Sequence, residues 1–370
     1  MNESIFTPQY TNSSVITTTL ETVERHRWLI DNMLMMPKHE VWLQRQMRLA
    51  NVKRASGTTR IEGAALDEEA VSRLVNRSTA VNYTKDEQAN INALQAYEFV
   101  DFLSDQPDIP IDELVIRQLN RYFLTGEPEL LIPGVYRRGQ NKIGDYTSPD
   151  QGDVPGLMRS FALWLRTYQT GVHPVIKAGL AHIHTVAIHP FWDGNGRTAR
   201  GLSTLVLQRS PYGFRKLLSL EAHLFSVRQD YIAAIEHTLG TSFSTSYDAT
   251  SWLEFFVVAL SRHLQELVDR LENWYHMMRQ AQSYWASNGW PERQMDAYSF
   301  AVQTGQITRS DYMEITGVSP ATASRDLNDM LNVGVFRVEG KTRSRVYYPL
   351  DLETVTTGGP PDEQLPLLVD

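Results

Sequence analysis

One short stretch of the sequence gathers the residue types that are needed to handle a chain of phosphates. It runs from His189 to Arg200 and reads HPFWDGNGRTAR. Its two glycines leave a turn in which several backbone N–H groups can point to one side, and the helix expected to follow adds its positive N-terminal end. Arg197 and Arg200 are three residues apart, so they are neighbours on that helix and can reach the same polyphosphate. The stretch therefore predicts an anion site.

Two further residues of this stretch could carry chemistry. Asp193 is placed to hold a hard cation such as Mg²⁺ beside the phosphates. His189 stands just before the turn, and an imidazole can take a proton from an incoming nucleophile near neutral pH. A base, a metal ligand, an anion-binding turn and two guanidinium groups in one segment predict the transfer of a phosphate-bearing group.

The same stretch resembles the signature of the Fic family, His-Pro-Phe-x-Asp/Glu-Gly-Asn-Gly-Arg-x-x-Arg, at every fixed position. The resemblance extends from the region of Thr58 to about Leu239. It implies a protein adenylyltransferase, which transfers AMP from ATP to a Ser, Thr or Tyr hydroxyl of a target protein and releases pyrophosphate. It also implies that His189 is the general base and that Asp193 holds Mg²⁺ on the α- and β-phosphates.

The resemblance further implies which residues contact ATP. The turn would form an anion hole, the two arginines would grip the phosphates, and Tyr231 and Ile232 resemble the residues beside the adenine. The full set implied for ATP binding is Glu62, Ile143, Gly144, Asp193, Gly194, Asn195, Gly196, Arg197, Thr198, Ala199, Arg200, Tyr231 and Ile232.

A second motif concerns control of the activity. The run from Thr58 to Gly63, TTRIEG, resembles the Ser/Thr-x-x-x-Glu-Gly/Asn inhibitory motif of Fic proteins. This resemblance implies that Glu62 pairs with Arg200 and displaces its contact to the γ-phosphate, so that ATP binds unproductively. The pairing is physically reasonable because a carboxylate and a phosphate compete for the same guanidinium fork.

Several alternatives stay open at the level of sequence. Some members of the family transfer other nucleotide or phosphate-bearing groups, and some remove AMP with the help of the inhibitory glutamate. A different class of function is a DNA-binding regulator, with basic residues on the second helix and the wing of a C-terminal winged helix-turn-helix: Arg325, Lys341, Arg343 and Arg345. That domain could equally serve protein docking or dimer contacts.

The elements that must position these residues are mainly helical. Apolar residues at helical spacing predict helices over about 86–103, 156–168, 173–188, 196–208, 229–239 and 252–285. We expect an extended polar arm up to about Thr19, a break between helices at Pro37, and an interruption of the helical pattern at Ser56–Thr59. A glycine-punctuated stretch over 133–146 predicts a small β-hairpin, and its 141–144 edge resembles the family's flap, which holds the target by strand addition.

These elements predict a mainly α protein with a helical Fic core, a small β-hairpin flap and a C-terminal winged helix-turn-helix. We expect an N-terminal helical segment over 1–105 with the inhibitory motif at 56–63, and a catalytic core over 106–250. A long connecting helix over 251–290, a winged helix domain over 291–355 and a flexible tail over 356–370 follow.

Composition limits the class of protein. The chain has 370 residues, no cysteine and a net charge of -8, so disulfides and thiolate metal sites are excluded, and a DNA role would have to be local. We expect no membrane span, because no apolar run approaches about 18 residues. The start shows no secretory signal, and the absence of cysteine predicts a cytoplasmic protein. The resemblance implies a homodimer, ATP as substrate, Mg²⁺ as cofactor and a target protein held by the flap.

Overall fold

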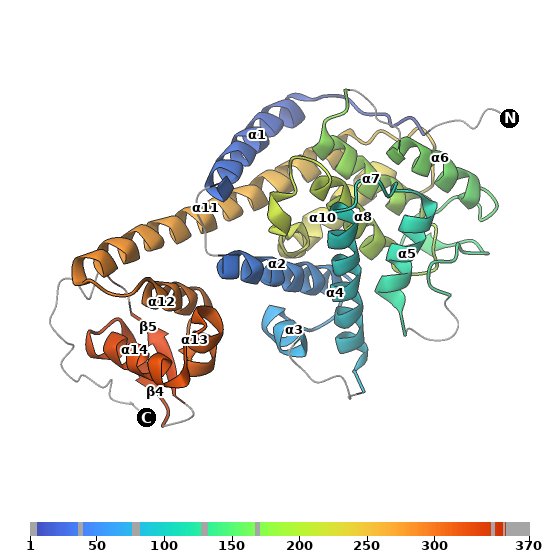
Figure 1. Cartoon of the computed structure of the whole chain (residues 1–370). Helices are drawn as coiled ribbons and strands as arrows, with labels where there is room; N and C mark the ends of the chain where they lie inside the picture. The colour runs from blue at the N-terminus through green and yellow to red at the C-terminus, as the bar shows by residue number, and fades with distance from the viewer. Residues whose placement is uncertain are drawn as a thin grey trace, which may run out of the picture. The chain divides into compact units, whose positions relative to one another are not determined.

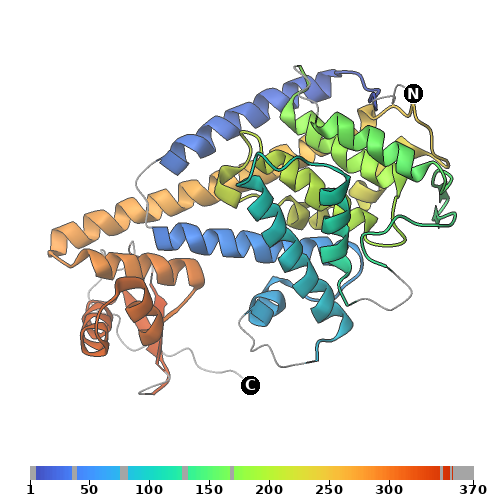
Figure 2. The same ribbon diagram turned by 45° about the vertical axis from the view of Figure 1, so that its right-hand side comes forward.

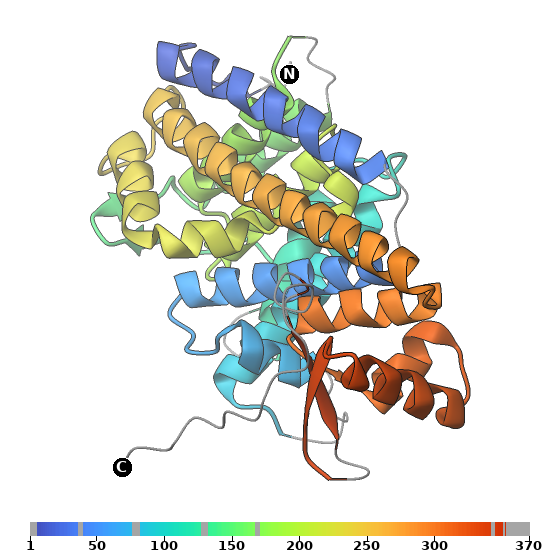
Figure 3. The same ribbon diagram turned by 90° about the vertical axis from the view of Figure 1, so that its left-hand side faces the viewer.

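The computed structural model describes residues 6–35, 40–75, 82–126, 132–166, 171–341, 345–350 and 352. The chain forms two compact units (Figure 1). The first contains Met1–Met36 and Arg45–Val268, and the second contains Pro37–Gln44 and Asp269–Asp370. The division falls within α11 (Thr250–Asn288), which Figure 3 shows as one continuous helix.

The first unit is built from helices, which confirms the mainly α class. They are α1 (Ser14–Met35), α2 (Glu40–Ile61), α3 (Glu68–Val75), α4 (Lys85–Ser104), α5 (Glu113–Leu124), α6 (Val154–Arg166), α7 (Pro174–Ile188), α8 (Asn195–Gln208), α9 (Leu220–Ser226) and α10 (Arg228–Leu239), with a 3₁₀ turn over Phe214–Lys216. Helix α8 is central, since it packs against α7, α4 and α5, and nearly all of its side chains are buried.

The starts of these helices follow from their sequences. Thr84 and Glu87 form a capping box at the start of α4, in which each side chain bonds the other residue's backbone N–H. The carboxylate of Asp112 accepts the Val115 N–H and caps α5. At α7 the cap is His173, followed by a proline in the first turn. Local chemistry therefore decides where these three helices begin.

Two sequence expectations about the N-terminal helices were wrong. The polar arm ends earlier than predicted, because Ile16, Val23 and Ile30 form a buried stripe on α1, which begins at Ser14. Helix α2 runs through Ser56–Thr59 without a break. Its glycine, Gly57, lies so close to the chain at the start of α9 that an added Cβ would be 2.5 Å from the Ala222 nitrogen. This glycine permits close helix packing and does not end the helix. Pro37 lies outside the described residues.

The hairpin exists but is short. Strand β1 (Lys142–Ile143) pairs antiparallel with β2 (Tyr146–Thr147), and the hairpin stands out from the first unit in Figure 2. The segment before β1 is irregular. On its other side β2 is covered, because Thr147 exchanges backbone hydrogen bonds with the 241–243 segment. The open edge of the hairpin is therefore the outer edge of β1.

The C-terminal part of the second unit combines three helices with a small sheet. In chain order these are α12 (Glu292–Thr304), β3 (Ile307–Thr308), α13 (Arg309–Thr316), α14 (Pro320–Asn332), β4 (Phe336–Glu339) and β5 (Val346–Pro349). The sheet is antiparallel in the order β3-β5-β4, and Ser319 caps α14. Both helices and both wing strands expected from the sequence are present. The predicted tail over 356–370 lies outside the described residues.

Within the described residues we find no helix with the length and apolarity that crossing a bilayer requires.

Candidate active site

A tight loop joins α7 to α8 and carries the residues singled out in the sequence. His189 ends α7 in a left-handed conformation with φ of 48°, and Gly194 caps α8 with φ of 73°. The Asn195 side chain braces the loop, because its Oδ1 accepts the Phe191 N–H at 2.9 Å and its Nδ2 donates to the Phe191 carbonyl at 2.8 Å. The amide is thus committed to the loop, and Asn195 can offer an anion only its backbone N–H in the first turn of α8.

His189 is in the protonation state that a general base requires. Burial lowers the pKa of its imidazole to about 4, and the neighbouring Arg137 guanidinium acts in the same direction. The ring is therefore neutral at pH 7, so it has a nitrogen lone pair that can accept a proton. His189 is the non-glycine residue of this loop with a positive φ, and it stands directly at the end of α7.

Asp193 and Arg197 form a pair at the mouth of the loop. The Asp193 Oδ1 accepts the Gly194 N–H at 2.5 Å, and Oδ2 accepts from Arg197 Nη2 at 3.2 Å. The Asp193 side chain is 47% exposed. A half-exposed carboxylate beside an anion-binding turn fits a Mg²⁺ ion that takes one carboxylate together with phosphate oxygens.

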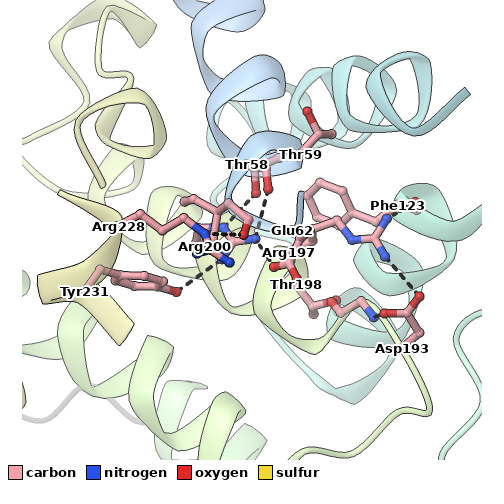
Figure 4. Close-up of polar contacts among 12 residues, drawn as sticks. Thr58, Thr59, Glu62, Phe123, Asp193, Arg197, Thr198, Arg200, Arg228 and Tyr231 are labelled. Atoms are coloured by element: carbon pink, nitrogen blue, oxygen red, sulfur yellow. Dashed lines mark hydrogen bonds and ion pairs between the residues drawn. The ribbon is translucent and has the colours of Figure 1, made fainter. Parts of the chain in front are cut away.

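Arg200 is the most enclosed charged group of the site (Figure 4). Its Nε donates to the Thr58 hydroxyl at 2.7 Å, and its Nη2 donates to the Glu62 carboxylate at 2.5 Å and to the Thr58 carbonyl at 3.2 Å. On the other side Nη1 donates to the Tyr231 hydroxyl at 3.2 Å. The end of α2 therefore holds the guanidinium of Arg200, as the inhibitory motif implied.

The Glu62 carboxylate occupies the anion site predicted at the start of α8. It lies over the first turn of α8, where a Cβ built on Gly196 would be only 2.7 Å from its Oε1. The place where the helix N-terminus, the flanking glycines and a buried arginine favour negative charge is thus occupied by the chain's own carboxylate. Its side chain remains 43% exposed.

The sequence did not single out Arg137, which clamps the loop to the base of the hairpin. Its backbone N–H donates to the Pro190 carbonyl, and its Nε donates to the His189 carbonyl, both at 2.9 Å. The other guanidinium nitrogens donate to the carbonyls of Gly139 and Pro149 at 2.8 and 2.5 Å. A buried arginine with four backbone contacts fixes the loop between α7 and α8 relative to the base of the hairpin.

Asn120 of α5 was likewise missed. Its Nδ2 donates to the Asp193 carbonyl at 2.9 Å, and its Oδ1 accepts the Gly134 N–H at 2.9 Å. Fully buried, it ties the signature loop to the segment that leads to the hairpin. Its Nδ2 also donates to the Thr198 hydroxyl at 3.3 Å, and because Asp193 and Thr198 lie 73 and 78 residues away, no local pattern could have indicated Asn120.

The remaining predicted ATP contacts lie in different environments. On the flap, Ile143 is 41% exposed and Gly144 has a positive φ. Tyr231 is buried, and its hydroxyl lies 2.9 Å from His182 Nε2 as well as against Arg200, while its neighbour Ile232 is partly exposed.

Two of the predicted ATP contacts are closed off in this conformation. The side chains of Thr198 and Ala199 are fully buried, and the Thr198 hydroxyl donates to the Gly194 carbonyl. Both residues therefore support α8 and do not line an open surface.

One His-His-Glu group, among the described residues, has ligand atoms close enough for a metal: His223, His263 and Glu266. However, His263 Nε2 accepts the Ser219 N–H at 3.0 Å, so its Nδ1 carries the proton and donates to Glu266. This arrangement is that of a hydrogen-bonded cluster. Because the lone pair of His263 is already used, the three residues do not together offer the ligand atoms that a metal needs.

The basic residues considered for DNA binding are only partly described. Arg325 is exposed and lies 3.8 Å from Asp326, and Arg345 is exposed. Arg343 falls in a part of the chain outside the described residues. No continuous basic face can be built from what is described.

Comparisons with known proteins find the family whose signature the loop resembles. Residues 110–207 match the Fic/DOC family, and residues 292–350 match the C-terminal domain described as that of a transcriptional regulator, DIP2311-like. Relatives named protein adenylyltransferase Fic are 43% identical over 98 residues in Drosophila willistoni and 41% identical over 106 residues in Drosophila yakuba. These alignments cover 26% and 28% of this chain, which spans only about a fifth of each relative, 20% and 21%.

Solved structures show the same fold. A Fic family protein from Desulfovibrio desulfuricans has a TM-score of 0.64 at 20% identity, with 93% of this chain and 98% of that chain covered. Fic-1 from C. elegans has a TM-score of 0.56 at 21% identity, with 70% and 72% covered. The fold expected from the signature is confirmed.

Proposed function

We propose that this chain, whose residues 110–207 form a Fic domain, transfers AMP from ATP to a hydroxyl side chain of a target protein. One observation carries the proposal. The Glu62 carboxylate bonds Arg200 at 2.5 Å directly over the first turn of α8, which marks that turn as an anion site held closed from within. Phosphates of ATP would take the same groups once the carboxylate leaves.

Each residue of the loop has a role in this reaction. The neutral His189 takes the proton of the target hydroxyl, whose oxygen then forms a bond to the α-phosphorus of ATP. The bond from the α-phosphorus to the oxygen that bridges it to the β-phosphate breaks, and pyrophosphate leaves. Backbone N–H groups of the first turn of α8 and both arginines stabilise the charge that develops on the phosphates. Asp193 would hold Mg²⁺, which neutralises the leaving group when bound.

Buried side chains hold the loop in a fixed position, which suits a reaction that depends on the precise placement of the reacting groups. Arg137 holds the His189 and Pro190 carbonyls, and Asn120 holds the Asp193 carbonyl, so the loop has little freedom to shift. The open edge of β1 can accept a segment of the target as an added strand. Small errors in the position of a reacting group are costly, and rigid support of this kind reduces them.

The inhibitory role of Glu62 is part of the same proposal. Arg200 is almost fully buried and is held by Thr58 of α2 and by Glu62, which directly follows that helix, so it cannot reach a γ-phosphate while this contact persists. Loss of the carboxylate would free Nη2 and remove a negative charge from the phosphate site. Both effects favour productive binding of ATP.

The test uses ATP labelled on the α-phosphate or, in parallel, on the γ-phosphate. Purified wild type, Glu62→Gly, and Glu62→Gly with His189→Ala are incubated with Mg²⁺, each with and without cell lysate. We expect α-label to become fixed to protein, to increase in Glu62→Gly and to disappear without His189. The γ-label should stay in solution.

Other outcomes assign the chemistry differently. Fixed γ-label would indicate phosphate transfer, and label from another nucleotide alone would change the donor. If Glu62→Gly fixes no label from any nucleotide, AMP transfer is wrong. A matched control is Glu236→Gly, which removes an exposed carboxylate from α10, outside the site, and should leave labelling unchanged.

A further inference from the structure

A pocket outside the nucleotide site opens between α5 and α6. Its volume is about 450 Å³, within the range of small-ligand and side-chain pockets. From α5 it is lined by Asp112, Glu113, Leu114 and Arg117, and from α6 by Arg159 and Arg166 among others. The two α6 arginines are seven residues apart, so they lie on the same face of that helix. The pocket thus joins three guanidinium groups with two carboxylates.

The two carboxylates of the pocket are already committed to the fold. Asp112 accepts the Val115 N–H at 3.0 Å as the cap of α5, and Glu113 accepts the Tyr136 hydroxyl at 2.9 Å. Both carboxylates keep their charge, but three guanidinium groups against two carboxylates leave the lining with one excess positive charge, on a chain whose net charge is -8. Such a local field attracts a negatively charged group that the protein as a whole would repel.

The wall of the pocket leads directly to the catalytic loop. Arg117 Nε donates to the Gly134 carbonyl at 2.7 Å, and its guanidinium lies 5.3 Å from the centre of the Tyr136 ring. That ring in turn lies 5.6 Å from the ring of Phe191 in the signature stretch. The next residue, Arg137, clamps the His189 carbonyl and the base of the hairpin. A partner bound in this pocket would lie beside the segment that feeds the flap.

We propose that this pocket is a second docking site for the protein substrate and that it binds an aspartate or glutamate side chain of the target. The inference rests on the proposed function, because it assumes a protein held at the flap. Guanidinium groups pair with carboxylates through paired hydrogen bonds, and the 70% exposed Leu114 adds an apolar contact at the rim. The substrates are therefore proteins with an acidic residue near the segment that carries the modified hydroxyl.

Direct binding tests the pocket independently of AMP transfer. The probe is a fluorescent peptide of glutamates and leucines, and the comparison peptide has glutamine at every glutamate position. Full-length wild type is compared with the double variant Arg159→Gln/Arg166→Gln. We expect the acidic peptide alone to bind, and the double variant to weaken it by about 2- to 30-fold, the range for two partly exposed ion pairs. Arg117 is left intact because it holds Gly134.

A matched control removes the same charge elsewhere. Arg25→Gln/Arg73→Gln takes two arginines from exposed positions on α1 and α3 and should bind the acidic peptide like wild type. Equal weakening in both double variants would show a general charge effect and overturn the proposal. So would equal binding of the glutamine peptide, or binding of inorganic pyrophosphate at this pocket without binding of the peptide.

The labelling assay then separates this inference from the proposed function. In the Glu62→Gly background, Arg159→Gln/Arg166→Gln should lower labelling of lysate proteins while leaving the apparent KM for ATP unchanged. The acidic peptide should compete with that labelling. If Glu62→Gly fixes no label but the peptide still binds, AMP transfer fails and the acidic-peptide site stands. If label is fixed and the double variant changes neither labelling nor peptide binding, the docking site fails alone.

Discussion

The sharpest quantitative prediction concerns the contact between Glu62 and Arg200. Replacing Glu62 with glycine removes a charge-assisted hydrogen bond of 2.5 Å between a buried guanidinium and a carboxylate that is 43% exposed. A hydrogen bond to a charged group contributes about 1.5–3 kcal/mol, and partial exposure reduces this to about 1–2 kcal/mol. Because about 1.4 kcal/mol corresponds to a factor of ten, we expect the labelling rate to rise about 5- to 30-fold.

The assay measures the initial rate at which α-labelled ATP modifies protein, at an ATP concentration below KM. Glu62→Gln serves as a milder change, since it keeps the shape and removes the charge, and it should lie between wild type and Glu62→Gly. Thr58 keeps two contacts to Arg200 in both variants, so α2 should stay docked and the melting temperature should change little. A rate that stays the same or falls, in a protein that remains folded, would refute the inhibitory role of this contact.

Three further predictions follow from the same structure. Because burial lowers the pKa of His189 to about 4, the rate of Glu62→Gly should hold as the pH falls from about 7 to 5 and drop only near pH 4, where the base becomes protonated; a midpoint near 6.5 would contradict the burial argument. Gly57→Ala should lower the free energy of unfolding by about 1–3 kcal/mol, because its Cβ would meet the Ala222 backbone. The control Gly156→Ala, whose Cβ would meet only the end of the Arg159 side chain at 4.0 Å, should lower that free energy by less than about 0.5 kcal/mol or raise it by about 0.5–1 kcal/mol. Equal effects of the two variants in chemical denaturation would argue against tight packing at Gly57. Burial also lowers the pKa of His184 to about 3, so the unfolded chain takes up a proton below about pH 6.5 that the folded chain does not, and stability should decline by about 2–3 kcal/mol by pH 4.5. His184→Gln should flatten this decline and the exposed His276→Gln should not, and the same slope in both variants would rule out His184 as its source.

Much of the fold was predictable because its signals are local. Thr84 with Glu87 and Asp112 mark helix starts by bonds to backbone groups three residues away. The expectation failed at Ser56–Thr59, where a glycine was taken to interrupt the helix. Gly57 is there because α2 must approach another segment of backbone closely, and that segment lies far away in the sequence. A glycine that permits close packing looks the same in sequence as one that ends a helix.

In the candidate site, too, the sequence predicted what depends on neighbouring residues, and the tertiary structure decided what depends on distant ones. By itself the sequence predicted the chemistry of the loop, since residues suited to act as a base, a metal ligand, an anion-binding turn and two phosphate contacts follow one another from His189 to Arg200. It also suggested, through resemblance, the partner of Arg200. Only the tertiary structure placed the Glu62 carboxylate over the first turn of α8, and only it showed that Arg137 and Asn120 hold the loop. The reason is physical. Arg137 and Asn120 hold the loop through its backbone carbonyls, a group that every residue carries, so packing alone decides which carbonyl each side chain meets and no pattern in the sequence indicates the pairing.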